Sequence, residues 1–375
     1  MTDVSPIDRQ RLKKLLHRMI DIYSPSGKEE ELLEYLSYFL KRQGLPVVRQ
    51  KVDDNRYNLV TAPAGTDIQL ALVGHLDTVP AHDLDDYEYK QTGDLITGLG
   101  AADMKAGCAA MIEAYLGLWA QSQGRPAVAL ALVVGEEEEG DGAAELVDDY
   151  EFPWAVIGEP TDLVVCPSNY GYLEVQLTAK GVARHASLAK SGQDPVEAML
   201  RLVLMLTRHL ETKRPEVVYN IRDLWTQPAR FTVPDFIEAW LDLHLPPSAP
   251  VGEIMAELED IVTAENHNNP RSDAGLRFVT IDSGFELPEK GPVLEALKTI
   301  YERRGIAWAP AAFRSHSDAN QLWEAGVRPV ILGPGQLEKS HSPDESISFD
   351  QVCLAAELYL ELATTFAASA TGPSR

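Results

Sequence analysis

The chain has 375 residues, 45% of them hydrophobic, and a formal net charge of −24 at pH 7. This length and apolar content suffice for two domains, each with its own core. The negative charge argues against a nucleic-acid partner, whose phosphates would be repelled. Because there is no run of eighteen apolar residues and no amino-terminal signal pattern, we expect a soluble protein without membrane contact. The three scattered cysteines favour a reducing compartment and a cytoplasmic location.

Two amphipathic helices are predicted near the start of the chain, at residues 8–23 and 28–43. In the first, Leu12, Leu15 and Met19 recur at helical spacing, and the second has a similar stripe. We expect both stripes to face a hydrophobic core.

The first buried strand is predicted at residues 68–73, and it leads through Gly74 to His75 and Asp77. Residues two apart in an extended chain point to the same side, so the imidazole would lie next to a carboxylate. Metal-binding histidines are commonly oriented by such a neighbour. Taken alone, the segment is equally typical of a core strand that ends in a polar turn.

Three further apolar runs also end in residues that can bind a metal ion. Residues 126–135 lead to the four acids Glu136–Glu139, residues 154–158 lead to Glu159, and residues 328–333 lead through a glycine-rich loop to His341. The four acids could instead be a solvated cap, but they directly follow a buried strand, which favours a functional role.

A glycine-rich loop at residues 98–107 lies between the first two of these strands and places Asp103 at the entrance to a predicted helix at 105–119. In an open α/β sheet, ligands bind in the crevice beyond the carboxyl ends of the strands. Five candidate metal ligands would therefore converge there: His75, Asp103, Glu137, Glu159 and His341.

This set of imidazoles and carboxylates suits zinc. It is large enough for two ions that share one bridging carboxylate, an arrangement used in hydrolysis. One acid of the run Glu136–Glu139 would then be spare. A carboxylate beside a metal-bound water, yet not itself a ligand, is the natural general base.

The joint order of these motifs resembles the M20 family of metallopeptidases, and the resemblance spans nearly the whole chain. The motifs are His-x-Asp, Gly-x-Gly-Ala-x-Asp-Met-Lys-x-Gly, Glu-Glu, Gly-Glu-Pro-Thr and a late His-Ser-Pro-Asp-Glu. The family includes acetylornithine deacetylase, succinyl-diaminopimelate desuccinylase, carboxypeptidase G2 and several di- and tripeptidases. The resemblance implies a zinc-peptidase-like α/β fold, with a mixed sheet flanked by helices and an inserted α+β, ferredoxin-like domain.

The resemblance also implies the domain boundaries and the ligand sets. We expect a catalytic metal-binding domain at residues 1–169 and 286–375, and a lid and dimerisation domain at 170–285. His75 and Glu159 would complete one zinc site, Glu137 and His341 would complete the other, and Asp103 would bridge them. The peptide bond after the bridging aspartate is expected to be cis, and cobalt could substitute for zinc.

Two further roles follow from the resemblance. Glu136 would be the general base, and Asp77 would hold the His75 ring in the tautomer that binds metal. The register within the acidic run stays open at this point, because base and ligand could instead be Glu138 and Glu139.

The middle of the chain has a different pattern from its flanks. The predicted order is a strand at 171–180, a helix at 194–210, strands at 229–232 and 236–245, a helix at 251–266 and a strand at 276–282. Two helices among four strands indicate a small α+β sandwich. Within it, residues 181–186 resemble the family's Gly-x-x-x-His turn, in which the histidine reaches the active site, often that of the partner subunit. The resemblance thus implies that His185 helps polarise the scissile carbonyl of the substrate. The alternative is a lone surface histidine.

The segments expected to bind the substrate depart from the family. Many members have Asp-x-Arg-x-Pro, with the arginine near the substrate carboxylate, whereas this chain has His244 at the arginine's position. The Thr-Ser-Asp-x-Arg of desuccinylases is His-Ser-Asp-Ala-Asn here, with His316 first and Asn320 last. These changes make a succinylated substrate less expected. Arg314 and His316 could replace the lost carboxylate binders, or could be ordinary loop residues.

These observations predict a dizinc hydrolase that cleaves the amide bond of a small N-acyl amino acid, in the manner of acetylornithine deacetylase. A short peptide is the alternative substrate for a di-, tripeptidase or carboxypeptidase of the same family. A deacylase that frees lysine or ornithine from a carrier protein is a further alternative, disfavoured by the acidic charge of the chain. The last is a catalytically silent relative that only binds a ligand. We expect a homodimer formed through the lid.

Overall fold

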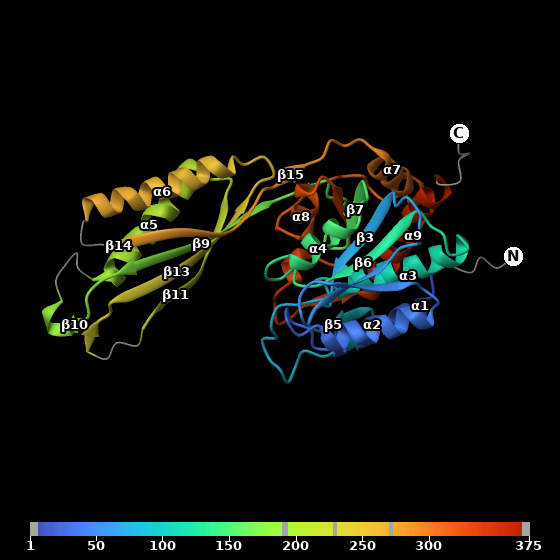
Figure 1. Ribbon diagram of the computed structural model, residues 1–375, viewed down its shortest axis with the longest axis horizontal. Coiled ribbons are helices and arrows are strands. Elements are labelled where there is room, and N and C mark those ends of the chain that lie inside the picture. The colour runs from blue at the N-terminus through green and yellow to red at the C-terminus, as the bar shows by residue number, and fades with distance from the viewer. Residues whose placement is uncertain (1–6, 190–193, 228–230, 270–272, 370–375) are drawn as a thin grey trace. The chain divides into compact units, whose positions relative to one another are not determined.

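The computed structural model describes residues 7–189, 194–227, 231–269 and 273–369. The chain forms two compact units (Figure 1). Unit 1 contains the residues up to Ser168, Leu287–Phe313 and the residues from Ser317 onward, and unit 2 contains Asn169–Glu286 and Arg314–His316. Three short strands lie where the chain passes from one unit to the other: β8 (Ser168–Asn169), β15 (Phe285–Glu286) and β16 (Ala312–Phe313).

Unit 1 is built on a mixed six-stranded sheet, which confirms the predicted α/β fold (Figure 1). Its strands, in spatial order, are β1 (Val47–Lys51), β2 (Tyr57–Thr61), β6 (Val128–Val133), β3 (Leu70–His75), β7 (Trp154–Ile157) and β17 (Arg328–Ile331). The last four are parallel to one another, so their carboxyl ends lie at one edge of the sheet. β3 and β6 are buried along their whole length, in agreement with their continuous apolar sequences.

Helices pack around this sheet, and a small three-stranded sheet completes unit 1. The helices are α1 (Arg9–Asp21), α2 (Glu30–Arg42), α3 (Lys105–Gln121), α4 (Asp141–Asp149), α7 (Pro292–Arg304), α8 (Asp318–Glu324), α9 (Phe349–Ser369) and the 3₁₀ turn η2 (Leu337–Lys339). The small sheet contains β4 (Lys90–Thr92), β5 (Leu95–Thr97) and β18 (Ser346–Ser348). No helix in the described ranges combines the length and the apolar character that a membrane crossing requires.

Helix α3 is apolar on nearly every side because it packs against α1, α9 and the sheet at once. Its Gly107 lies so close to the carbonyl oxygen of Gly158 that an added Cβ would stand 2.1 Å from that oxygen. On the loop after β17, a Cβ at Gly333 would stand 2.2 Å from the same oxygen. The Gly158 carbonyl, which directly precedes Glu159, is thus held between Gly107 and Gly333. Neither glycine can be replaced by a larger residue unless the backbone moves.

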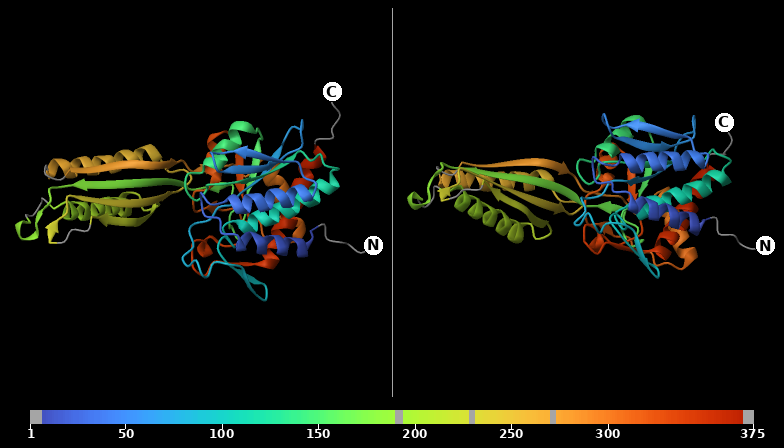
Figure 2. Two further views of the ribbon diagram at one scale, coloured as in Figure 1. Left: turned by 60° about the horizontal axis from the view of Figure 1, so that its bottom comes forward. Right: turned by 90° about the horizontal axis from the view of Figure 1, so that it is seen from below.

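Unit 2 is an antiparallel sheet with two helices on one face (Figure 2). Its strands, in spatial order, are β11 (Val218–Thr226), β13 (Phe236–Leu245), β9 (Gly171–Lys180) and β14 (Asp273–Asp282). The helices are α5 (Pro195–Lys213) and α6 (Val251–Asn268), and they share one apolar core with alternate residues of β9 and β13. A two-stranded ladder of β10 (Arg184–His185) and β12 (Thr232–Val233) and the turn η1 (Ala186–Leu188) complete the unit.

The sequence did not predict β11, which is an edge strand of this sheet. Its side chains are exposed almost throughout, and a bulge between Ile221 and Asp223 breaks the alternation that would mark a strand. A strand was expected instead at 229–232. Residues 228–230 lie outside the described part, and Thr232 belongs to the short strand β12.

The contact between α3 and Gly158 generates a test of how the fold positions Glu159. Gly107→Ala should lower the free energy of unfolding by about 1–3 kcal/mol, because the clash is with backbone that cannot rotate away. It should also weaken divalent-metal binding, since Gly158 precedes a candidate ligand. Urea unfolding and metal titration measure the two effects.

The matched control is Gly252→Ala, because Gly252 is also helical but has open space where a Cβ would stand. It should leave metal binding unchanged and stability equal or slightly higher. Equal stability and metal affinity for the Gly107 variant and the wild type would refute the prediction.

Candidate metal centre

His75 is the last residue of β3, and it is completely buried among acids. Its Nε2 lies 3.3 Å from Asp103 Oδ1, 3.6 Å from Glu159 Oε1 and 3.7 Å from Glu136 Oε2. Three separate segments supply these carboxylates: the loop before α3, the residue two beyond β7, and the turn after β6. The structure therefore brings together residues that the sequence placed at the ends of parallel strands.

Asp103 lies between His75 and the late histidine, His341. Its Oδ2 is 3.6 Å from His341 Nε2, and the same imidazole nitrogen is 2.9 Å from Glu137 Oε2. The Asp103–Met104 peptide bond is cis, as the resemblance implied. His341 has a positive φ of 55°, and half of its side chain is exposed, so this end of the cluster faces solvent.

The ligand atoms form two overlapping triads with one member in common. His75, Asp103 and Glu159 make one triad, and Asp103, Glu137 and His341 make the other; within each, the potential ligand atoms lie within 4.8 Å of one another. Glu159 Oε1 is buried and forms no hydrogen bond with any described residue. An unsatisfied buried oxygen beside an imidazole and a second carboxylate fits a bound cation well. A third triad of His75, Glu136 and Glu137 overlaps both.

Burial dominates the electrostatics of the centre. It raises the pKa of Glu136 well above the ordinary value, and neighbouring Glu159 and Glu137 raise it further. Burial and Asp103 raise the pKa of Glu159 in the same way. For His75, burial alone would lower the pKa, but the surrounding carboxylates prevail and raise it well above the ordinary value. The metal-free centre thus holds protons that divalent cations would replace.

The acidic run divides into a buried half and an exposed half. Glu136 is buried and the Glu137 side chain is only 6% exposed, whereas Glu138 and Glu139 are exposed. This burial favours the register in which Glu137 is a ligand and Glu136 is the base.

Asp77 contacts this turn in a way that sequence reasoning missed. Its carboxylate accepts hydrogen bonds from the main-chain N–H of Glu136 (3.3 Å), the N–H of Glu137 (3.1 Å) and the Ser26 hydroxyl (2.7 Å). His75 Nδ1 is closer to the main-chain oxygen of Asp77, at 3.0 Å, than to the carboxylate, at 3.6 Å. The side chain of Asp77 therefore fixes the acidic turn, and its main chain contacts the imidazole.

Asp318 and Glu345 are among the buried acids of unit 1 that were not assigned from the sequence. Both carboxylate oxygens of Asp318 are buried without a hydrogen-bond partner among the described residues, and its charge raises the pKa of Glu136 and Glu159. Glu345 is also buried, on the loop that follows His341. Both residues lie in motifs whose other residues were given roles in the sequence analysis. Nothing in the spacing of Asp318 or Glu345 indicated that these side chains are buried.

The candidate substrate residues are divided between the units. In unit 2, the His316 ring stacks on that of Tyr172 at 4.4 Å between centroids, and the centroid of the His244 ring lies 5.5 Å from that of Tyr172. Arg314 is exposed in the same short segment as His316. Asn320 is in unit 1, where it is buried and its Oδ1 accepts the main-chain N–H of Ser317, so it caps α8.

His185 is in unit 2 as well, exposed at the start of η1. Its Nδ1 accepts the main-chain N–H of Ser187 at 3.3 Å and lies 2.8 Å from the Ser187 hydroxyl. A neutral imidazole whose Nδ1 is an acceptor carries its proton on Nε2.

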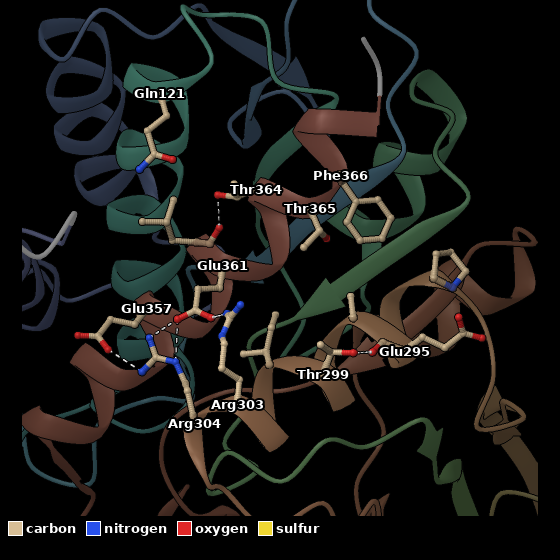
Figure 3. Close-up of a pocket in the computed structure, with 14 residues that line it drawn as sticks. Gln121, Glu295, Thr299, Arg303, Arg304, Glu357, Glu361, Thr364, Thr365 and Phe366 are labelled. Atoms are coloured by element: carbon tan, nitrogen blue, oxygen red, sulfur yellow. Dashed lines mark hydrogen bonds and ion pairs between the residues drawn. The ribbon is translucent and has the colours of Figure 1, made fainter. Parts of the chain in front are cut away.

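A cavity of about 1000 Å³ lies elsewhere in unit 1, between α7 and α9 (Figure 3). Ion pairs join the two helices at one end of it, from Arg303 and Arg304 to Glu357 and Glu361. None of the candidate metal ligands lines this cavity. Its size therefore does not identify it as the place of the chemistry.

A mixed α/β sheet with an imidazole–carboxylate cluster at the carboxyl edge of its parallel strands is the arrangement expected of a metallohydrolase. The sequence profile of Peptidase family M20/M25/M40 matches residues 71–365. The chain belongs to this family, as the motif order indicated.

Individual relatives agree with this assignment. A LysW-lysine/LysW-ornithine hydrolase of Sulfurisphaera tokodaii is 24% identical over 94% of this chain and 95% of its own length. A probable succinyl-diaminopimelate desuccinylase of Staphylococcus epidermidis is 33% identical, but the alignment covers only 54% of this chain and 52% of that protein. A dinuclear metal-binding peptidase of the M20 family from Bacillus subtilis has the same fold, with a TM-score of 0.70 and 13% identity over 96% of this chain and 98% of that structure's chain.

The raised pKa values generate a prediction for the metal-free protein. The pKa of Glu136 lies well above 4.5, and that of His341 is raised by Glu137 and Asp103 from 6.5 to about 9, against the effect of burial. Between pH 5 and pH 9 the folded protein therefore binds more protons than the unfolded chain. The stability that these protons contribute is fully present below the pKa values of the unfolded chain, and it is lost as the pH rises through the higher pKa values of the folded protein. In EDTA, the free energy of unfolding should fall by at least about 1 kcal/mol between pH 5 and pH 9.

Urea unfolding at pH 5, 7 and 9 measures this slope. Saturating zinc should flatten or reverse it, because the ions replace the protons. A metal-free protein whose stability rises across this window would contradict the account of the centre.

Proposed function

We propose that this protein is a dizinc amidohydrolase that cleaves the amide bond of a small N-acyl amino acid, in the manner of acetylornithine deacetylase. The observation that carries the proposal is the pair of triads that share Asp103, with the buried carboxylate of Glu136 beside them and outside the two assigned ligand sets. Two ions in these triads would supply a bound water of lowered pKa and polarise the substrate carbonyl.

The residues of the chain have distinct roles in this proposal. Glu136 takes a proton from the attacking water and returns it to the departing amine. Burial and the neighbouring acids raise the pKa of Glu136 above that of an ordinary glutamate, the direction expected of a base that must also return its proton. Asp77 holds the main chain of Glu136 and Glu137, so base and ligand stay in register. His185 donates from Nε2 to the developing oxyanion, a role supported by the tautomer that Ser187 imposes.

The substrate is proposed to have one carboxylate. His244 and His316, with Arg314 nearby in sequence, are the proposed binding residues. Burial lowers the pKa of His244, so this side chain is a neutral hydrogen-bond partner where many family members have a guanidinium. A neutral donor holds a carboxylate less strongly than a bidentate arginine does. This favours an N-acetyl substrate over an N-succinyl one, whose second carboxylate would need another cation.

A second candidate is a deacylase that frees lysine or ornithine from a carrier protein. It is favoured by the Sulfurisphaera tokodaii relative, a LysW-lysine/LysW-ornithine hydrolase that aligns over nearly its full length. Peptidase activity on short peptides and a silent, ligand-binding role are the remaining alternatives. The silent role is disfavoured because the chain has a suitable residue at each of the six positions, the five proposed metal ligands and the proposed base.

We further propose a cytoplasmic homodimer formed through unit 2. The apolar side chains exposed on edge strand β11 support the dimer, since Ile221, Leu224 and Trp225 are 42–55% exposed. The three cysteines are free and buried, in agreement with a reducing compartment. Sedimentation analysis with Trp225→Asp would test the dimer.

The role of Glu136 leads to a specific expectation. Glu136→Gln should lower kcat by about 10²–10⁴ while two zinc ions still bind, because a general base is lost and no assigned ligand is changed. Steady-state assays and metal analysis of the same preparation measure both quantities.

Glu138→Gln is the matched control, since it makes the same change two residues away on an exposed side chain. It should keep wild-type kcat. If this control lost activity and the Glu136 variant kept it, the base and the ligand would instead be Glu138 and Glu139.

The substrate assignment is tested with N-acetyl, N-succinyl and dipeptide substrates and His244→Arg. The wild type should prefer N-acetyl amino acids. The new guanidinium should raise kcat/KM for N-succinyl substrates about tenfold relative to N-acetyl ones. The reason is that it can form a charge-assisted hydrogen bond with the second carboxylate, which N-acetyl substrates lack. His267→Arg, the same change at an exposed site on α6, should leave the ratio unaltered. A wild type that binds zinc but hydrolyses nothing in the panel would oppose the enzymatic proposal.

A further inference from the structure

Glu345 is a buried acid that belongs to neither metal triad and is not the proposed base. Only 5% of it is exposed. Its carboxylate accepts three main-chain hydrogen bonds from the loop that ends at Asp103. Gly100 N–H donates to Oε2 at 2.8 Å, and the N–H groups of Ala102 and Asp103 donate to Oε1 at 2.8 and 3.0 Å. The main-chain oxygen of Glu345 also accepts from Gly98 N–H at 3.4 Å.

The loop that Glu345 holds has few main-chain bonds of its own. Gly98 and Gly100 have φ values of 146° and 74°, a conformation in which neither helix nor strand can form. Buried N–H groups need partners. The carboxylate of Glu345 is the hydrogen-bond acceptor for three N–H groups of this loop. The last of these three N–H groups belongs to Asp103, the residue that both triads share.

Glu345 itself lies on the segment that carries His341. Glu345 follows His341 by four residues, and its N–H donates to the main-chain oxygen of Ser342 at 3.2 Å. One residue therefore links the backbone of Asp103 to the turn that bears His341. His75 and Glu159 do not depend on this link, because His75 is the last residue of β3 and Glu159 follows the end of β7 in the main sheet.

We propose that Glu345 is a positioning residue that sets the spacing of Asp103 and His341, and that it thereby controls binding of the ion in the triad Asp103–Glu137–His341 more than binding of the other ion. The inference rests on the proposed dinuclear centre. Its consequence is an unequal pair of sites, one formed by the sheet and one dependent on a single side chain between two loops.

Glutamine cannot reproduce the contact. It has one acceptor oxygen, and its amide nitrogen is a donor that would face a main-chain N–H. Whichever way the amide is turned, at least one of the three loop N–H groups loses its partner. Glu345→Gln thus removes the link without changing the size of the side chain.

The test is a cobalt titration of the metal-free protein, followed by calorimetry and by the visible absorption of bound cobalt. The wild type should bind two ions. Glu345→Gln should bind one ion with unchanged affinity and the second at least about tenfold more weakly, the effect of losing a charge-assisted hydrogen bond. His341→Ala is the reference for loss of that one site, and the Glu345→Gln protein with one ion should have the same cobalt spectrum.

Asp344→Asn is the matched control, since it removes one negative charge at the adjacent, exposed residue. It should bind both ions as the wild type does. The inference is overturned if Glu345→Gln binds both ions normally, or if it weakens both equally while urea unfolding shows a folded metal-free protein. Should Glu345→Gln fail to fold, Glu345→Asp, which keeps the charge but shortens the reach, undergoes the same titration with the same deciding outcomes. A wild type that binds no ions would instead refute the dinuclear centre itself.

Discussion

Mutual repulsion among buried carboxylates is the constraint on which the rest of this structure depends. Asp103, Glu136, Glu137 and Glu159 gather around one imidazole at the edge of the sheet, in surroundings that exclude most water. Two like charges 4 Å apart repel by about 4 kcal/mol at an effective dielectric constant of 20. When no ion is bound, burial and then the neighbouring acids raise the pKa values of Glu136 and Glu159, so that protons relieve part of the repulsion. The carboxylates raise the pKa values of His75 and His341 against the effect of burial, and these two imidazoles in turn lower the pKa of Asp103. Two divalent cations would relieve it at neutral pH and turn a destabilising cluster into a reactive one.

The fold withstands this repulsion by attaching the acids to rigid or tightly bonded segments. Parallel strands deliver His75 and Glu159, and the carbonyl before Glu159 is enclosed by Gly107 and Gly333. The acids of the turn after β6 are held by Asp77 through their main chain. Asp103 is on a loop, and Glu345 supplies the partners that the loop lacks. Elements of regular structure thus form one half of the centre, and side chain to main chain hydrogen bonds form the other.

Much of this could be predicted from the sequence. Continuous apolar runs located β3, β6, β7 and β17 because a strand buried on both faces has no polar positions. Residues just after those runs then had to meet, since parallel strands end at one edge. The order of the motifs added the family and the pairing of ligands, which no single motif would have supported.

Other features were not predictable, for physical reasons. Edge strand β11 buries little and contains a bulge, so it lacks the alternation by which strands are recognised. The amide of Asn320 caps α8, a role that the motif does not show because it depends on where the helix begins. Glu345 and Asp77 act on main-chain N–H groups that are distant in sequence or belong to irregular loops. A residue pattern records side chains, and it contains no signal for such contacts.

Anomalous diffraction at the zinc absorption edge, from crystals grown with zinc, tests the central claim most directly. We expect two peaks about 3.5–4 Å apart, with Asp103 between them, one ion beside His75 and Glu159 and the other beside Glu137 and His341. A single peak, or two peaks of which one does not contact Asp103, would contradict the dinuclear centre.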